Sequence, residues 1–146
     1  MALHLIKLCV GVESIDQLSG WIADDIARQR GLGLVPEDTH TTRMMPKRIP
    51  EILDGGSLYW VIKGQVQARQ RILDLQAVTG ADNIQRCRIV FDPEVVPTEW
   101  QPKRPFQGWR YLLPKDAPRD LAAIGGSAGD ELPAALKAEL AELGLL

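Results

Sequence analysis

The sequence predicts one α+β domain in which helices pack on a small, curved sheet of antiparallel and mixed strands. Its 146 residues suffice for one hydrophobic core, and 45% apolar with 25% charged residues is an ordinary globular composition. One long amphipathic segment follows the first strand-like segment, and further strand-like segments then succeed one another between residues 57 and 113. This order excludes both an alternating βαβ fold and an all-β sandwich.

The N-terminal part predicts a strand, a helix and a second strand. Residues 3–10 are short and rich in branched apolar side chains, which is typical of a strand that is buried on at least one face. Ser14 and Gln17 have the form of a capping box, and apolar residues then recur at helical spacing. We therefore expect a helix over about 14–30, followed by a β-prone segment at 39–45.

The central part predicts a short helix and three strands. Pro50 suits the first turn of a helix, which can hardly exceed two turns before a glycine pair ends it. Residues 57–78 read as two strands that are joined by a tight hairpin at Lys63 and Gly64. A further strand is expected over 84–91.

Proline shapes the next segment. Four prolines between 93 and 105 predict an extended connection rather than a central strand, because proline cannot donate to a ladder of hydrogen bonds. One more strand is then expected over 106–113.

The composition changes after Pro114 to alanine, leucine, glycine and acidic residues, so we expect an α+β domain over 1–119 and a tail over 120–146. Residues 125–129 predict a flexible linker, and Pro133 begins an expected C-terminal helix. Its apolar stripe predicts docking on the domain or on a second copy of the chain, and comprises Leu132, Leu136, Leu140 and Leu143.

The net charge of −2 hides a division of the chain. Residues 41–119 hold 13 basic and 8 acidic residues, whereas the flanks hold 4 basic and 11 acidic residues. Seven of the eight aromatic residues also lie in this middle part, and only Trp21 lies outside it. Basic and aromatic groups together favour a surface that attracts phosphate and stacks on bases. The alternative is that they mark the position of the sheet, since aromatic residues favour strands.

The sequence predicts a cytoplasmic protein that does not associate with membranes. No apolar run approaches the roughly 18 to 20 residues that cross a bilayer. The N-terminal apolar stretch contains His4 and Lys7 and lacks the features of a signal peptide.

We expect neither a metal nor another cofactor. The cysteines lie in apolar strand-like segments and the histidines lie far apart in the sequence, so buried free thiols are favoured over a metal site. These residues are Cys9, Cys87, His4 and His40.

The segment TRMMPKRIPEILDGGSLYWVIKGQVQARQRILDL, with RPFQGWRYL downstream, resembles an uncharacterised bacterial family known as domain of unknown function DUF 1489. That resemblance covers most of residues 1–120 and implies no activity. A weaker similarity connects residues 50–61 and 106–110 with the PUA-like group, which includes the ASCH and EVE domains. It implies a small PUA-like β-barrel that binds RNA or modified bases, and some ASCH members hydrolyse modified nucleosides.

Four arginines form the first candidate site. They alternate along two expected strands, so each pair points to one face of the sheet, and coincident faces would make a phosphate-binding patch. Gln67 and Gln85 would extend this patch with neutral donors. In the alternative, nearby acidic side chains pair with the arginines and neutralise them. The arginines are Arg69, Arg71, Arg86 and Arg88, and the acidic residues are Asp74, Asp82, Asp92 and Glu94.

A second basic cluster flanks the short helix. We expect the turn over 45–50 to bind an anion, unless its prolines merely shape a loop and its charges keep the loop soluble. Trp109 and Tyr111 are candidates for stacking on a base, whereas Trp60 is expected in the core. The basic residues of this cluster are Arg43, Lys47 and Arg48, and a further basic group near Trp100 and Trp109 comprises Lys103, Arg104 and Arg110.

These observations predict a protein that binds RNA or a modified nucleotide through a basic sheet face and aromatic stacking. No catalytic residue is assigned, and an enzyme is the less favoured class. One alternative is a hydrolase acting on a modified nucleoside, with Thr41 or Thr42, Lys47 and Glu51 as a catalytic set. The other is an interaction module that forms a homodimer through the C-terminal helix.

Overall fold

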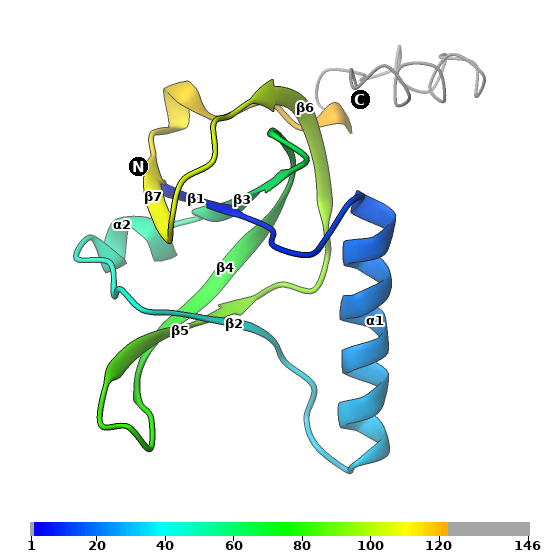
Figure 1. The fold of residues 1–146 in the computed structure, drawn as a ribbon, viewed down its shortest axis with the longest axis vertical. Helices are drawn as coiled ribbons and strands as arrows, with labels where there is room; N and C mark the ends of the chain where they lie inside the picture. The colour runs from blue at the N-terminus through cyan, green and yellow to red at the C-terminus, as the bar shows by residue number, and fades with distance from the viewer. Residues whose placement is uncertain (1, 123–146) are drawn as a thin grey trace.

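The computed structural model describes residues 2–122, which form an α+β fold with an open seven-stranded sheet and two α-helices (Figure 1). The α+β class is confirmed, but the sheet is not closed, so the expected barrel is not confirmed. The elements are β1 His4–Leu8, α1 Ile15–Gly31, β2 Asp38–Thr42, α2 Ile49–Leu53, β3 Ser57–Ile62, β4 Gln65–Thr79, β5 Gln85–Phe91, β6 Val96–Pro102 and β7 Trp109–Leu112.

The long strand β4 organises the sheet. Its first half pairs with β3 on one side and β6 on the other, and its second half pairs with β5. The strand order is β2-β5-β4-β3-β1-β7, and all pairs are antiparallel except β1 with β3. Irregular register interrupts each of the three ladders of β4, and such bulges increase strand bending and twist. One strand therefore serves two differently oriented parts of the sheet.

The helix α1 confirms the helix expected over 14–30. Ser14 caps it by accepting a hydrogen bond from the Gln17 backbone N–H at 3.1 Å, and the Gln17 side chain accepts one from the Glu13 N–H at 2.7 Å. Leu18 and Ile22 are its buried residues and face the sheet. The helix lies along one side of the molecule, next to β2 (Figure 1).

The expected hairpin at Lys63 and Gly64 is also confirmed. Both residues have positive φ, 50° and 77°, which is the combination that a tight two-residue turn between twisted strands requires. The turn joins β3 to β4.

The prolines after β5 do not prevent a strand, and here the sequence prediction was incomplete. Residues of β6 pair with β4 even though Pro97 and Pro102 lie within the strand. The two prolines are tolerated because β6 lies at an edge of the sheet, where a missing backbone N–H removes few hydrogen bonds. The neighbouring expectations were too long: β2 ends at Thr42 rather than at 45, and β7 begins at Trp109 rather than at 106.

Two hydrophobic clusters pack on the two sides of the sheet. The main core lies between the sheet and the two helices, and it includes Leu58, Trp60 and Ile52. A smaller core lies behind the sheet and includes Tyr59 and Val61. Successive residues of β3 thus serve different cores, which explains why all six residues of this strand are buried.

The linker expected at 125–129 and the leucine-rich helix expected from Pro133 lie outside the described residues. Within residues 2–122, neither helix has the length and apolar character needed to span a membrane.

Replacing Gly56 with alanine is expected to lower the free energy of unfolding by about 3 kcal/mol, at the upper end for overpacking. A Cβ atom there would lie 2.2 Å from the Leu3 carbonyl oxygen and 2.4 Å from the Ile52 carbonyl oxygen, and backbone atoms cannot move aside cheaply. Gly20→Ala is the matched control, because it has open space in the exposed face of α1 and should raise stability by about 1 kcal/mol. Urea denaturation measures both; equal stabilities of the two variants would contradict the packing described.

Candidate functional site

The side chains of the four arginines on β4 and β5 project from the same face of the sheet. Along β4 and β5 they alternate with buried residues that face the main core, so all four point away from it. Three of them are already paired. The Arg69 guanidinium binds both carboxylate oxygens of Asp120, Arg86 binds both of Asp82, and Arg88 binds Glu37.

These pairs satisfy much of the predicted phosphate patch within the chain. Arg69 also donates to the Ser57 hydroxyl at 2.9 Å and is only 24% exposed, so its guanidinium is a structural group. Gln67 is buried and donates to the Ile62 carbonyl, which removes it from the surface, whereas Gln85 is exposed. Within residues 2–122, Arg71 is the member of the four that is exposed and forms no ion pair.

The turn over 43–48 lies beside the aromatic residues of β7, and these residues have a different role from the expected base stacking. The Trp109 indole N–H donates to the Met44 carbonyl at 2.7 Å, and the Tyr111 hydroxyl accepts from the backbone N–H groups of Lys47 and Arg48. These rings contact each other edge to face with centroids 4.9 Å apart. They therefore fasten the turn over 43–48 to β7.

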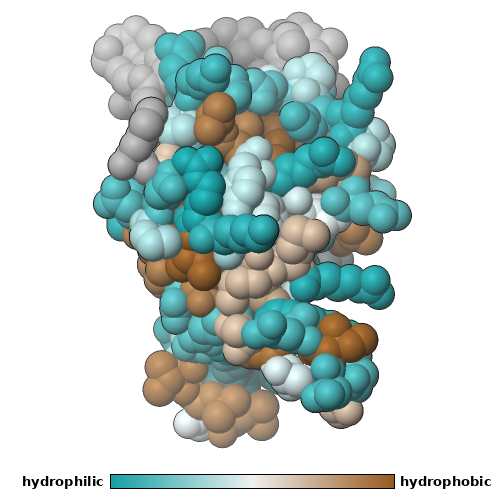
Figure 2. Space-filling view, turned by 90° about the vertical axis from the view of Figure 1, so that its left-hand side faces the viewer, coloured by the Kyte–Doolittle hydropathy of each residue, from teal (hydrophilic) through white to brown (hydrophobic). Residues whose placement is uncertain are grey.

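The fastened turn lies on the side of the molecule that carries α2 (Figure 1). Figure 2 views that side and shows mainly hydrophilic side chains with separate hydrophobic patches between them. Arg43 and Lys47 are exposed there, whereas Arg48 binds Glu51 and lies 6.0 Å from the centre of the Tyr111 ring. Arg110 points to the other side of β7, 5.3 Å from the centre of the Phe106 ring.

The catalytic set considered from the sequence is engaged elsewhere. Thr42 is buried and its hydroxyl donates to the Met44 carbonyl at 3.2 Å, and the Glu51 carboxylate is held by Arg48. The Lys47 side chain is exposed and Thr41 is exposed. None of the cavities described for residues 2–122 is lined by these groups together.

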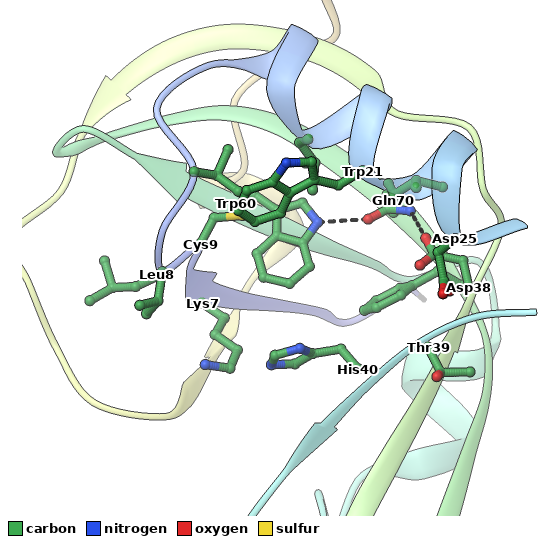
Figure 3. A pocket seen from close by; sticks show the side chains of 15 residues that line it. Lys7, Leu8, Cys9, Trp21, Asp25, Asp38, Thr39, His40, Trp60 and Gln70 are labelled. Carbon is green, nitrogen blue, oxygen red and sulfur yellow. Dashed lines mark hydrogen bonds between the residues drawn. The ribbon is translucent and has the colours of Figure 1, made fainter. Parts of the chain in front are cut away.

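A cavity of about 250 Å³ lies between α1, β1, β2 and the sheet (Figure 3). We call it the α1–β2 cavity. Its walls are largely apolar and aromatic, and its polar groups differ at the two ends. The aromatic residues that line it are Trp21, Trp60, Phe91 and His40.

A buried hydrogen-bond chain forms the inner wall of this cavity. The Trp60 indole N–H donates to the Gln70 amide oxygen at 2.8 Å, and the Gln70 amide nitrogen donates to an Asp38 carboxylate oxygen at 2.5 Å and to the Asp92 carbonyl at 3.1 Å. Gln70 is 1% exposed, so all its hydrogen bonds are made within the protein. Trp60, expected in the core, is 5% exposed and also lines the cavity.

One end of the cavity carries Lys7 and His40, whose side chains lie next to each other in Figure 3. The His40 ring contacts Trp60 edge to face, with centroids 5.6 Å apart. Its Nε2 atom is buried without a hydrogen-bond partner. Burial, assisted by the positive charge of Lys7, lowers the pKa of His40 and favours the neutral imidazole.

The opposite end carries two carboxylates, Asp25 and Asp38. Asp25 is fixed by hydrogen bonds from Arg28 and Gln29, and these bonds lower its pKa. Burial raises the pKa of Asp38, although the hydrogen bond from Gln70 opposes this effect. The pKa values of these two carboxylates are therefore shifted in opposite directions.

The cysteines show no sign of reactivity. Cys9 lines the α1–β2 cavity, and burial raises its pKa to about 11, so the thiol is protonated at neutral pH. Burial also raises the pKa of Cys87 to about 11. Within residues 2–122, no group of three or more histidine, cysteine, aspartate or glutamate side chains is placed to hold a metal ion.

A second, more polar cleft of about 720 Å³ lies where β6 and β7 face each other without pairing. Lys103, Lys115 and the Arg119–Glu99 ion pair line it. Trp100 also lines it, and its indole N–H is buried without a partner.

Sequence reasoning missed Lys7, Trp21, Asp38 and Gln70 as candidates for a site. One signal was available: Gln70 lies between Arg69 and Arg71, so alternation along β4 places this amide on the inner side of the sheet. No local signal connects Lys7, Trp21 and Asp38, because they come from three different elements.

The comparisons with known proteins identify a family without an activity. The family described as "Protein of unknown function (DUF1489)" matches residues 5–146. No curated protein and no solved structure matches the chain.

The protein is expected to lose stability as the pH falls from about 7.5 to 5. The pKa of His40 is below its ordinary value in the folded state, so its contribution to stability is complete above about pH 6.5 and is lost as the pH falls through the lowered pKa. The pKa of His4 is also lowered by burial and by Arg69, and its Nδ1 accepts from the Ser57 N–H. Urea denaturation at several pH values measures how steeply the free energy of unfolding changes with pH.

The variant His40→Gln should reduce this slope and leave the contribution of His4. An unchanged slope in His40→Gln would show that His40 is protonated equally easily in the folded and unfolded states.

Proposed function

The chain belongs to the family described as "Protein of unknown function (DUF1489)", and we propose that it binds a nucleotide, with the base in the α1–β2 cavity. The observation that carries this proposal is the polarity of the cavity: aromatic walls, a cation at one end and carboxylates at the other. The sequence predicted nucleotide binding at the surface of the sheet, whereas this proposal places the binding site in the α1–β2 cavity.

The size and walls of the cavity suit a planar ring system. Its volume of about 250 Å³ is slightly below the roughly 300 to 1,000 Å³ of pockets for drug-sized ligands, so a base fits better than a larger molecule. Trp21, which is 50% exposed, provides accessible aromatic surface from α1, whereas Trp60 and Phe91 line the cavity from the sheet and are 5% and 2% exposed. Stacking of a base on such rings is worth about 1 to 3 kcal/mol.

The cationic end suits the phosphate of a nucleotide. Lys7 forms no ion pair within the described part of the chain, so its ammonium is available for an anionic ligand. Its neighbour across the β1–β7 ladder is Trp109, which holds Met44 beside the exposed Arg43. A phosphate that leaves the cavity past Lys7 therefore approaches the basic turn.

The acidic end suits the N–H groups of a base. Asp38 uses one carboxylate oxygen for Gln70, and its other oxygen accepts no hydrogen bond within residues 2–122. An exocyclic amine or a ring N–H of a purine or pyrimidine is a donor of the required kind.

The same arrangement is compatible with a nucleotide within single-stranded RNA. The base would enter the cavity and the backbone would run toward Arg43 and Lys47, while Arg71 offers one free guanidinium on the sheet. As part of this proposal, the fold is related to the PUA-like group and the protein is located in the cytoplasm. In support of that fold, β7-β1-β3-β4-β6 is a five-stranded series whose end strands β6 and β7 face each other across the polar cleft.

Guanosine 5′-monophosphate is expected to bind and to quench tryptophan fluorescence, because Trp21 and Trp60 line the cavity. Lys7→Ala should weaken this binding about tenfold, since a hydrogen bond to a charged group contributes about 1.5 to 3 kcal/mol. The same substitution should weaken the binding of guanosine much less, because guanosine has no phosphate.

Arg30→Ala is the matched control, since it removes an exposed cation from the last turn of α1. Anisotropy of labelled single-stranded RNA at about 50 and 200 mM salt tests the polymeric form, because phosphate contacts weaken with salt. Absence of binding by the mononucleotide, the nucleoside and RNA alike would refute the proposed function.

A further inference from the structure

We propose that the acidic end of the α1–β2 cavity selects a positively charged base, of the kind made by N-methylation of a ring nitrogen, over its neutral parent. This inference rests on the proposed function and specifies its ligand class. It arises from the juxtaposition of Asp38, Asp25 and the aromatic walls (Figure 3).

Asp38 is a carboxylate without a balancing cation. It is half-buried, and within the described residues it forms no ion pair. Its hydrogen-bond donor is the neutral amide of Gln70, and the nearby Asp25 adds further negative potential. A half-buried charge without a partner is unfavourable in free energy. A ligand that brings positive charge to it therefore gains more binding free energy than a neutral ligand.

Asp25 contributes a second negative group to the same end. Its carboxylate is shared with Arg28, which lies outside the cavity, and with Gln29. The hydrogen bonds keep Asp25 ionised, because they lower its pKa. Because Arg28 forms an ion pair with Asp25 and compensates much of its charge, Asp38 is the uncompensated carboxylate of this end, whereas Lys7 lies at the other end.

The aromatic walls distinguish a cationic ring from a simple amine. The face of an indole attracts a cation beyond what it gains from apolar contact, and tryptophan is the strongest of the aromatic residues in this respect. Trp60 is held in place by its hydrogen bond to Gln70, so its ring is preorganised. Trp21 is 50% exposed and lies at the opening, where it covers a bound ring from the solvent side.

The two ends together define a ligand that is positive at the base and negative at the phosphate. A monophosphate of 7-methylguanosine has this distribution, and guanosine 5′-monophosphate has the same shape without the methyl group and the positive charge. 8-Methylguanosine 5′-monophosphate supplies a methyl group near the same position on a neutral ring. These three compounds separate charge from size.

Isothermal titration calorimetry with the full chain and these three nucleotides tests the inference. We expect 7-methylguanosine 5′-monophosphate to bind about tenfold more tightly than either neutral nucleotide. In Asp38→Asn, binding of all three should weaken, and the ratio between the methylated cation and its parent should fall below about twofold. Circular dichroism establishes that the variant is folded; Asp25→Asn, which leaves the Gln70 bond intact, should reduce the ratio by a smaller factor.

Equal binding of the charged and neutral nucleotides would overturn this inference and leave the proposed function standing. So would a preference that 8-methylguanosine 5′-monophosphate shares, or one that survives both substitutions. Failure of every nucleotide to bind would overturn the inference together with the proposed function.

Discussion

The buried amide of Gln70 is the interaction on which the wall of the α1–β2 cavity depends. It connects the Trp60 indole of β3, the Asp38 carboxylate of β2 and the Asp92 carbonyl that follows β5. A buried amide must use its donors and acceptor within the protein, because an unsatisfied polar group costs roughly 1 to 3 kcal/mol. The orientation of Trp60 and of Asp38 is thus set by one side chain.

The bend of β4 makes room for this arrangement. The first half of β4 belongs with β3, β1 and β6, and its second half belongs with β5 and β2. Because the strand changes partners along its length, β2 is carried away from β1, and α1 packs over the space between them (Figure 1). That space contains the main core at its base and the α1–β2 cavity at its opening.

The surface charge is organised mainly for the fold. Arg69 ties the segment around Asp120 to β4, and Arg88 ties the segment before β2 to β5 through Glu37. Such pairs restrict where an external anion could bind, since the guanidinium groups already have carboxylate partners. The uncompensated charges of the cavity are instead Lys7 and Asp38, at its opposite ends, and this separation gives the cavity its polarity.

The sequence by itself determined most of the local structure. The capping residue Ser14, the glycine-containing turn at Gly64 and the periodicity of the strands act over a few residues, so propensity and alternation were enough to place them. The tertiary structure alone decided which charges are neutralised and which residues meet in a site. Arg69 and Asp120 are 51 positions apart, and Lys7, Trp21 and Asp38 come from β1, α1 and β2. No local pattern encodes such distances, because they depend on how the bent strand β4 arranges the other elements in space.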